Sequence, residues 1–439
     1  MIPKIQTQIA KTAPPPPGLP IYGRLNPATV SFMGQTNYAS TLEEKRFIFG
    51  IKRQDRRHHI YVVGQRNIGK SKLLELLIRQ DIASGYGLML IDYQGSLTKG
   101  VLDFIPQKRM EDVVYLDPAD AEHSLIFNPF SGVDFKIQFI KDLTEIMKDF
   151  FGSLWMPRID HLFRFACLAL LDYPGARFSE IMNLLTDESF RLQVVKYIKN
   201  DLVKNFWEIE FSQKWLPQFE TEAIRSLIDK LSQFFSHPAI RQIFNHQENK
   251  INFEEFIENK KIILVSLSRN KLGEENAAIL GSIFLMKLRL AGIARQSLNE
   301  SQRQDFYVYI DGFNNLALPI LENFLAEAHL GGLNFTITHT SLTQLSTKTN
   351  VSLLSNIGTL IIFRVSGEDA LRLETALMPV FKARDMINLA SGEFYIKMII
   401  DGETFDPFSS RTLKVLPPSQ PSYHEQIIEL SRKKYTGVV

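Results

Sequence analysis

The chain has 439 residues, more than one ordinary hydrophobic core accommodates, so we expect at least two domains. Hydrophobic residues make up 45% and charged residues 22%, as in most globular proteins. The net charge of +2 excludes a global basic field, so any contact with nucleic acid must come from local patches. The single cysteine, Cys167, excludes a disulfide framework and a four-cysteine zinc site, and it fits a reducing cytoplasm.

Two segments near the start of the chain have an unusual composition. Residues 1–30 have the composition of a linker, in which Pro14–Pro17 favours a semi-rigid polyproline II spacer and a disordered tail is the alternative. Lys52–His59 is a basic run placed directly before the first strongly apolar segment. This run is either a solvated entry to a strand or a patch that contacts phosphates.

From Ile60 onward, short apolar runs alternate with helical patterns. Runs rich in β-branched residues cover 59–64, 87–92 and 112–118, and a helical pattern at 72–85 separates the first two. From 132 to 258 nearly all apolar residues recur at spacings of three and four, which predicts helices throughout. Strand patterns return at 261–268, 306–311, 333–340 and 358–365, and Asp401-Gly402 predicts the turn of a final hairpin.

This order predicts an α/β fold, in which a RecA-like P-loop NTPase core, a mostly parallel sheet flanked by helices, carries an inserted all-α domain. We place the core at residues 48–131 and 259–415 and the insert at 132–258. Residues 1–47 are expected to be an N-terminal linker or extended segment, and residues 416–439 a polar C-terminal tail.

The strongest motif is GQRNIGKS at Gly64–Ser71, which fits G-x-x-x-x-G-K-S between a strand and a helix. Glycines let the backbone wrap phosphates so that its N–H groups and the helix N-terminus face the anion. The motif predicts that Lys70 reaches the β- and γ-phosphates of ATP and that Ser71 binds Mg²⁺; a relic loop that no longer binds nucleotide is the alternative. The residues assigned to nucleotide contact are Gly64, Asn67, Ile68, Gly69, Lys70, Ser71 and Lys72.

A later strand pattern, 306–311, ends in a carboxylate, Asp311, which we assign to the Mg²⁺ site together with Ser71. The alternative is that Asp311 only caps the next helix. Many ATPases of this build place a glutamate directly afterwards to orient the attacking water, and here that residue is Gly312. Asp92, at the end of the strand that follows the P-loop helix, is the best substitute, in a position that could lie beside the P-loop strand. The alternative for Asp92 is a turn aspartate.

No segment has the pattern of a membrane span. The longest apolar stretch, around 277–294, contains Lys287 and Arg289, so we interpret it as a buried helix. The N-terminus lacks the apolar core of a signal peptide. We therefore expect a cytoplasmic protein that reaches the inner membrane only peripherally, through partners.

With these motifs in order, the chain resembles the FtsK/HerA superfamily, and within it the type IV secretion coupling-protein-like ATPases of conjugative DNA transfer. The resemblance runs from Gly34–Tyr38 to Pro407–Thr412, nearly the whole chain. The P-loop is common to many families, whereas the ordered set of the other segments is more specific. These segments are VVYLDPAD, FNPF, WMPR, KIILVSLSRNKLGEENAAILG, YIDGFNNLALP, NIGTLIIFRVSGEDA and PFSSRT.

The resemblance implies a hexameric ring around DNA, with ATP bound between subunits and hydrolysis driving translocation. It implies that the helical insert faces the DNA entry side and that membrane-associated secretion proteins are partners. Arg364 is the candidate for an arginine finger that reaches the γ-phosphate of a neighbouring subunit; a local salt bridge is the alternative.

Three polar positions depart from the family pattern. The family usually has Asp-Glu-Phe-Gln-Asn where this chain has Asp311–Asn315, and often His-Gln where this chain has His339-Thr340. After Asp92 the family tends to Pro-His-Gly-Asp, and this chain has Tyr93–Ser96. An active DNA translocase and a nucleotide-binding ring subunit that hydrolyses poorly therefore both remain open, and a small-molecule kinase is disfavoured.

Overall fold

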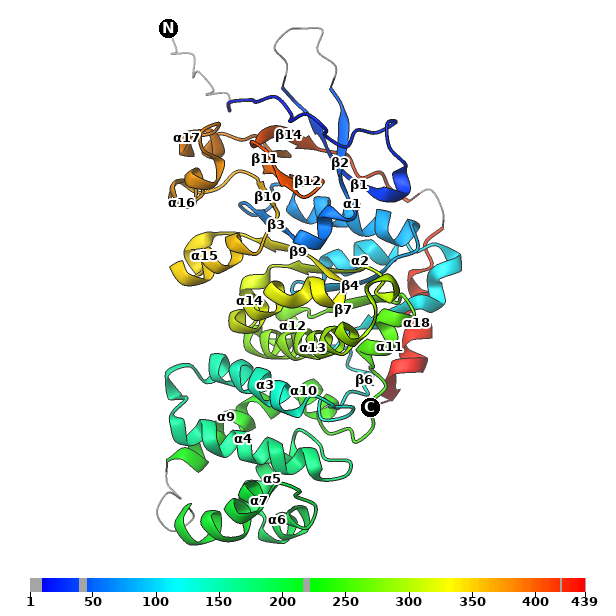
Figure 1. Cartoon of the computed structure of the whole chain (residues 1–439). Helices are drawn as coiled ribbons and strands as arrows, with labels where there is room; N and C mark the ends of the chain where they lie inside the picture. The colour runs from blue at the N-terminus through cyan, green and yellow to red at the C-terminus, as the bar shows by residue number, and fades with distance from the viewer. Residues whose placement is uncertain (1–9, 39–45, 216–221, 419–420, 439) are drawn as a thin grey trace, which may run out of the picture.

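Seven neighbouring parallel strands form the middle of the main sheet in the computed structural model, which describes residues 10–38, 46–215, 222–418 and 421–438 (Figure 1). Nearly every residue of these strands is buried, because helices cover both faces of a parallel sheet. In order across the sheet, the strands are β10 (Thr359–Ile362), β3 (Ile60–Val63), β9 (Leu333–His339), β8 (Phe306–Asp311), β4 (Gly87–Asp92), β7 (Ile262–Ser266) and β5 (Val113–Leu116).

Four antiparallel strands extend the sheet beyond β10. They are β11 (Glu393–Lys397), β14 (Phe408–Thr412), β1 (Val30–Thr36) and β2 (Ile48–Lys52). Two small ladders lie outside the main sheet: β12 (Ile399–Ile400) with β13 (Glu403–Thr404), and β6 (His123–Leu125) with β15 (Thr436–Val438). The first ladder is the expected turn, since Asp401 and Gly402 both have positive φ.

The two faces of the sheet belong to separate apolar cores. Helices α1 (Lys70–Ala83), α2 (Ser96–Leu102) and α18 (His424–Tyr435) pack on the face of Ile60 and Val62. The face of Tyr61 and Val63 is covered by α11 (Phe253–Glu258), α12 (Arg269–Leu272), α13 (Glu274–Ala294), α14 (Leu318–Glu327), α15 (Thr347–Ser355), α16 (Gly367–Leu377) and α17 (Ala383–Ile387).

The segment predicted to be helical forms a separate layer at one end of the molecule (Figure 1). Its elements are α3 (Lys136–Phe151), α4 (Pro157–Asp172), α5 (Glu180–Thr186), α6 (Glu188–Val195), α7 (Asp201–Asn205), a π-helix at Phe206–Trp215, α9 (Ala223–Phe235) and α10 (Pro238–Ile243). Helix α3 packs on α13, so the insert shares a core with the α/β part. The exact domain boundaries stay a prediction.

Short 3-10 helices complete the connections. They are η1 (Pro27–Thr29), η2 (Asp55–His58), η3 (Gln107–Asp112), η4 (Gly152–Leu154), η6 (Arg295–Ser297), η7 (Glu300–Gln302), η8 (Phe313–Asn315), η9 (Ala328–Gly331) and η10 (Leu342–Gln344). Residues 274–297 are the one described segment long and apolar enough to cross a membrane, but 83% of its apolar window is buried inside the protein. The interpretation of α13 as a core helix is therefore confirmed.

Both ends of the chain differ from the sequence-based expectation. Within the supposed linker 1–47, of which 1–9 and 39–45 lie outside the described residues, β1 joins the main sheet, and Ala13 is buried with its N–H donating to Ser409 Oγ. In the supposed tail 416–439, α18 packs on β5 and β15 pairs with β6. The described parts of both segments are ordered by partners distant in sequence, which composition cannot reveal.

Candidate nucleotide-binding site

The predicted P-loop connects β3 to α1 at the carboxyl edge of the sheet. Its backbone turns through Asn67 (φ 57°) and Gly69 (φ 124°), both outside the range that most side chains tolerate. A Cβ on Gly64 would lie 2.6 Å from Cβ of Phe363, so only glycine fits there. The sequence prediction of a glycine-dependent loop at this strand–helix junction is thus matched by its backbone geometry.

Lys70 lies inside this loop. Its Nζ donates to the backbone oxygens of Gly64 at 2.6 Å and Gln65 at 2.7 Å. Burial lowers the pKa of Lys70 to about 8, although the nearby carboxylate of Asp311 opposes the shift. The ammonium therefore stands where a phosphate would meet it together with the backbone N–H groups of the loop.

Two further residues predicted to contact nucleotide, Ile68 and Lys72, have side chains that are engaged elsewhere. The side chain of Ile68 is buried in the core, and its carbonyl accepts a hydrogen bond from Gly392 N. The ammonium of Lys72 points away and pairs with Glu75 at 2.7 Å. In both cases the N–H group is the part available to an anion at the start of α1.

Ser71 and Asp311 are brought together as predicted for a metal pair. Ser71 Oγ donates to Asp311 Oδ2 at 2.9 Å, and the other carboxylate oxygen accepts from Thr338 Oγ1 at 2.6 Å. A hydroxyl and a carboxylate beside a phosphate-binding lysine are ligands that suit Mg²⁺. The residues present therefore fit a nucleotide with its magnesium ion.

Gly312 has a left-handed backbone, with φ 84° and ψ 54°. Its N–H donates to Thr338 Oγ1 at 3.0 Å, and its carbonyl accepts from Asn315 Nδ2 at 2.8 Å. A Cβ at this position would lie 3.2 Å from that same Nδ2 atom. The missing glutamate is therefore accompanied by a backbone conformation that disfavours one.

Asp92 does not occupy the position expected for a substitute base. Strand β4 lies beside β8, so Asp92 is the register partner of Asp311, and β8 and β9 separate it from the P-loop strand β3. Its carboxylate accepts from the N–H groups of Gln94, Gly95 and Thr98, and burial raises its pKa. The turn interpretation describes these contacts, and the expected position beside β3 is wrong.

Arg364 lies beside the P-loop of its own chain. Its carbonyl accepts from Gln65 N at 2.9 Å, and its Nε lies 3.4 Å from Gln65 Oε1. Within the described residues, no carboxylate forms an ion pair with Arg364. The salt-bridge alternative is therefore not observed there, and the finger role stays a prediction.

The sequence that forms this site matches a known protein family. Residues 49–377 match the family model described as the type IV secretion-system coupling protein DNA-binding domain, and this range covers more than half of the chain. The chain belongs to this family. The recognition made from the sequence motifs is confirmed, whereas no curated protein matches the sequence.

Solved structures of coupling and secretion proteins share the fold. The bacterial conjugative coupling protein TrwBdeltaN70 has a TM-score of 0.64 at 14% identity, over 85% of this chain and 89% of that one. TrwB in complex with ADP and Mg²⁺ has a TM-score of 0.63 at 15% identity, over 85% and 89%. VirB4 of Thermoanaerobacter pseudethanolicus has a TM-score of 0.60 at 11% identity, over 88% and 96%. The RecA-like P-loop fold class is thereby confirmed.

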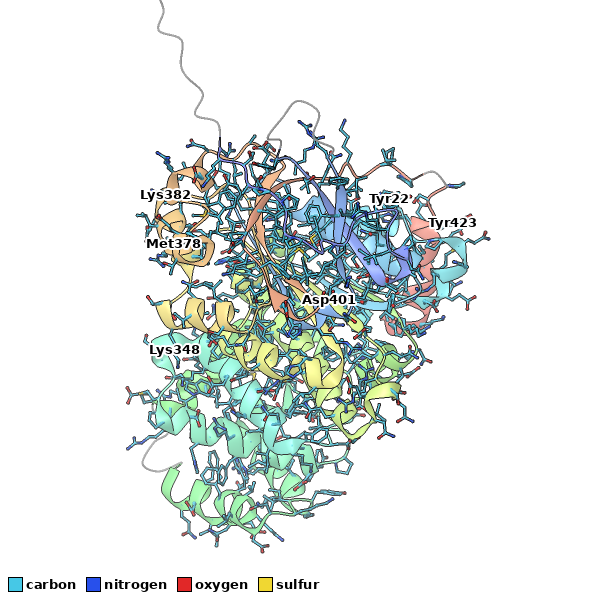
Figure 2. All side chains as sticks on the ribbon, turned by 45° about the horizontal axis from the view of Figure 1, so that its top comes forward. Tyr22, Lys348, Met378, Lys382, Asp401 and Tyr423 are labelled. Atoms are coloured by element: carbon cyan, nitrogen blue, oxygen red, sulfur yellow. The ribbon has the colours of Figure 1, made fainter. Side chains whose placement is uncertain are left out.

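The basic run of this coupling-protein-family chain forms ion pairs within the chain. Arg53 and Arg56 are buried and both pair with Asp81 of α1, while Arg57 pairs with Asp305 at 3.0 Å. Lys52 Nζ lies 2.6 Å from Oδ2 of Asp401, which Figure 2 labels at the β12–β13 turn. The interpretation as a phosphate-contacting patch, like that of a solvated strand entry, is wrong for Arg53 and Arg56, because both are buried against Asp81. For Lys52 and Arg57, which are partly exposed, it stays a prediction.

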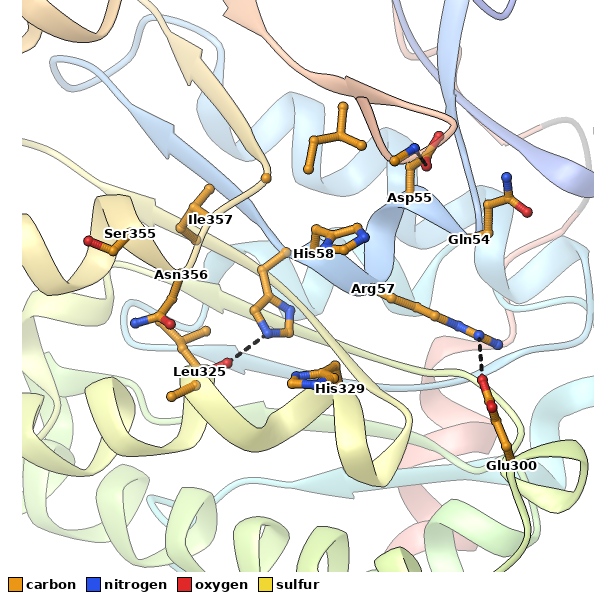
Figure 3. A pocket seen from close by; sticks show the side chains of 15 residues that line it. Gln54, Asp55, Arg57, His58, Glu300, Leu325, His329, Ser355, Asn356 and Ile357 are labelled. Carbon is orange, nitrogen blue, oxygen red and sulfur yellow. Dashed lines mark hydrogen bonds and ion pairs between the residues drawn. The ribbon is translucent and has the colours of Figure 1, made fainter. Parts of the chain in front are cut away.

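The end of the same run lines a cleft of about 630 Å³ at the amino edge of the sheet (Figure 3). His59 Nε2 contacts the carbonyl of Leu325 at 3.0 Å, and Arg57 pairs with Glu300 across the opening. The P-loop lies at the opposite, carboxyl edge of the sheet, so this cleft is not the nucleotide site.

The sequence analysis named His339 on β9 but missed its neighbour Thr338. Thr338 contacts Asp311, and the neutral ring of His339 donates from Nε2 to Gln344 Oε1 at 3.1 Å and accepts at Nδ1 from the Tyr61 hydroxyl at 3.2 Å. Burial lowers the pKa of His339 to about 4, which keeps the ring neutral. The available signal was the alternation of Asn334, Thr336 and Thr338 in a central strand, where apolar residues are usual.

Proposed function

We propose that this protein binds ATP with Mg²⁺ at the P-loop and acts as the ATPase of a conjugation or type IV secretion-like DNA transfer system. The observation that carries the proposal is the hydrogen bond of 2.9 Å between Ser71 and Asp311, beside the ammonium of Lys70. It is supported by the structure of TrwB with ADP and Mg²⁺, a protein of the same fold. In such a site, Lys70 and the loop N–H groups bind phosphate oxygens, while Ser71 and Asp311 hold the metal.

We propose further that the protein works as a ring, in the form of a hexamer, and translocates DNA. The description of the matching family as a DNA-binding domain supports the contact with DNA, and the hexameric ring is what the resemblance to the superfamily implies. Arg364 remains the candidate arginine finger for the nucleotide of a neighbouring subunit. Because it lies beside Gln65, it can reach that nucleotide only if the neighbouring subunit docks against this edge of the P-loop. Because Arg53 and Arg56 are buried on Asp81, DNA contact has to involve other side chains.

We place the protein in the cytoplasm, with membrane-associated secretion proteins as partners at the inner membrane. The support is family membership together with the burial of α13 inside the core. Co-purification with the membrane fraction that disappears after a salt wash would match peripheral attachment; resistance to salt and release by detergent alone would contradict it.

A second candidate function is a nucleotide-binding structural or regulatory subunit that hydrolyses ATP slowly or not at all. Two observations favour it: Gly312 offers no side chain to orient water, and both carboxylate oxygens of Asp92 are engaged by the turn that follows β4. In this case nucleotide binding would set the conformation of the ring rather than drive each step of translocation.

Purified protein with Mg²⁺-ATP, assayed with and without DNA and with the oligomeric state measured in the same sample, tests both. Turnover that DNA stimulates in a ring-sized species supports the motor. Nucleotide binding without turnover supports the second function. Absence of nucleotide binding rules out both.

A further inference from the structure

Three polar residues follow one another on the same face of β9: Asn334, Thr336 and Thr338, each at most 1% exposed. Strand β9 lies in the middle of the parallel sheet, where such positions are normally apolar. Burying a hydroxyl or an amide group is costly unless it forms a hydrogen bond, so each position calls for a partner.

The three positions differ in what they contact. Asn334 Nδ2 donates to Asp305 Oδ1 at 3.1 Å. Thr338 Oγ1 donates to Asp311 Oδ1 at 2.6 Å and accepts from Gly312 N at 3.0 Å. Thr336 Oγ1 is buried and has no hydrogen-bond partner among the described residues. Strand β9 therefore carries two threonines of equal burial, of which one contacts the candidate metal site.

The register of the sheet places Thr338 there. Asp311 and Thr338 are direct partners on the neighbouring parallel strands β8 and β9. With Ser71 Oγ on Oδ2 and Thr338 Oγ1 on Oδ1, the carboxylate is held from both sides, by α1 and by β9. Thr338 Oγ1 also accepts from Gly312 N and so fixes the peptide group between Asp311 and Gly312. The Thr338 hydroxyl therefore sets both the rotation of the Asp311 carboxylate and the path of the backbone that follows it.

We propose that Thr338 is a positioning residue for the metal site: it orients the Asp311 carboxylate toward Mg²⁺ bound with nucleotide. This inference rests on the proposed function. Ser71 alone cannot do the same work, because its hydroxyl is itself assigned to the metal. The Thr338 hydroxyl is engaged by Asp311 and Gly312 and acts through Asp311. Its loss therefore weakens the contribution of Mg²⁺ and leaves metal-free nucleotide binding intact.

The test measures binding of ADPNP, the non-hydrolysable ATP analogue, with Mg²⁺ and with EDTA, for the wild type and for Thr338→Val, Thr338→Ser and Thr336→Val. Thr338→Val keeps the shape and removes the hydroxyl. We expect it to weaken binding with Mg²⁺ by about tenfold, equal to about 1.4 kcal/mol, and to change binding in EDTA by less than about twofold. Thr338→Ser restores binding with Mg²⁺, and Thr336→Val, the matched control, behaves as the wild type.

Equal behaviour of Thr338→Val and Thr336→Val would overturn the inference and leave the proposed function standing. A loss of equal size in Mg²⁺ and in EDTA would also overturn it, because it would point to the P-loop and not to the metal. If wild type fails to bind ADPNP at all, the proposed function falls, and the inference with it. If Thr338→Val does not fold, Thr338→Ala compared with Thr338→Ser decides the same question.

Discussion

Ser71 and Asp311 are 240 residues apart in the chain, and a hydrogen bond of 2.9 Å joins their side chains. This contact links the first turn of α1 to the end of β8 and closes the candidate site around Lys70. Neither residue is held by this bond alone, since Asp311 also contacts Thr338 on the far side. The site is therefore assembled from three strand–helix junctions of one sheet, and its parts can be tested separately.

Replacing Lys70 with alanine is expected to weaken nucleotide binding by at least tenfold, because the loop loses the ammonium that lies inside it. Lys72→Ala is the matched control, since this neighbouring ammonium is exposed and pairs with Glu75. Isothermal titration with Mg²⁺-ADPNP distinguishes the two. Equal affinities for both variants would contradict the P-loop assignment.

The same lysine gives nucleotide binding a pH dependence. Because burial lowers the pKa of Lys70 to about 8, the free protein loses this proton as the pH rises through 8, whereas binding to phosphate requires the charged form. Affinity is expected to fall by about five- to tenfold between pH 7.5 and 9. In Lys70→Ala the residual affinity should vary much less over this range, and an unchanged slope would assign the titration to another group.

Restoring the missing glutamate is not expected to restore catalysis by itself. At φ 84°, Gly312→Glu places a Cβ in the left-handed region and near Asn315, which costs about 1–2 kcal/mol. We expect thermal unfolding to show similar destabilisation for Gly312→Ala and Gly312→Glu, and less for Gly312→Asn, since asparagine tolerates this region. Turnover of Gly312→Glu should stay within about twofold of the wild type; a tenfold gain would mean that the loop rearranges easily and that the carboxylate alone was lacking.

Much of the site could be predicted from local sequence, because most of its side chains belong to two short, contiguous segments. The P-loop and the strand ending in Asp311 are short patterns whose structural context is set by neighbouring residues. Thr338 could not be assigned this way, because its partner is fixed by the register between β8 and β9 and not by spacing along the chain. The left-handed turn at Gly312 was likewise invisible, since glycine is compatible with many conformations.

The fold also combines elements that local sequence predicts with elements that depend on pairing between distant segments. Alternating strand and helix patterns predicted the parallel sheet and its covering helices, whereas β1 and β15 depend on pairing with β14 and β6 from the other end of the chain. The basic run is the clearest case, because its charge suggested an external ligand. Arg56 is instead 1% exposed and pairs with Asp81, which lies in the last turn of α1, at the end away from the P-loop. Only three-dimensional proximity separates a binding patch from an internal ion pair.

The buried pair of arginines on Asp81 is expected to be a large contributor to stability. Two guanidinium groups would remain buried without a carboxylate in Asp81→Asn, and the loss of a buried partner typically costs about 3–5 kcal/mol. Arg57→Gln removes a half-exposed cation from the same run and should cost about 1 kcal/mol or less. Chemical denaturation compares the two, and similar losses would mean that solvent reaches the Asp81 cluster.

The internal pairing of the run also limits its role in DNA binding. We expect Lys52→Gln and Arg57→Gln to change DNA affinity by less than about twofold and to leave the salt dependence of binding unaltered, because each cation is already paired with a carboxylate of its own chain. Fluorescence anisotropy with labelled DNA at several salt concentrations measures both quantities. A reduced salt slope in either variant would return the run to the DNA-contacting surface.

His59 is expected to make folding stability sensitive to mild acid. Its Nδ1 accepts from Phe335 N and its Nε2–H donates to the carbonyl of Leu325, so the ring is neutral, and burial lowers its pKa to about 4. The unfolded chain, with an ordinary pKa near 6.5, binds the proton first, so stability falls as the pH drops from about 6.5 toward 4. Between pH 7 and 5 this one group contributes a loss of about 2 kcal/mol. His59→Asn, which removes the titrating ring, should be less stable at pH 7 but should lose about 2 kcal/mol less than the wild type on acidification. Denaturant unfolding at both pH values gives the difference directly, and parallel pH profiles for the two proteins would show that His59 is not the group that titrates.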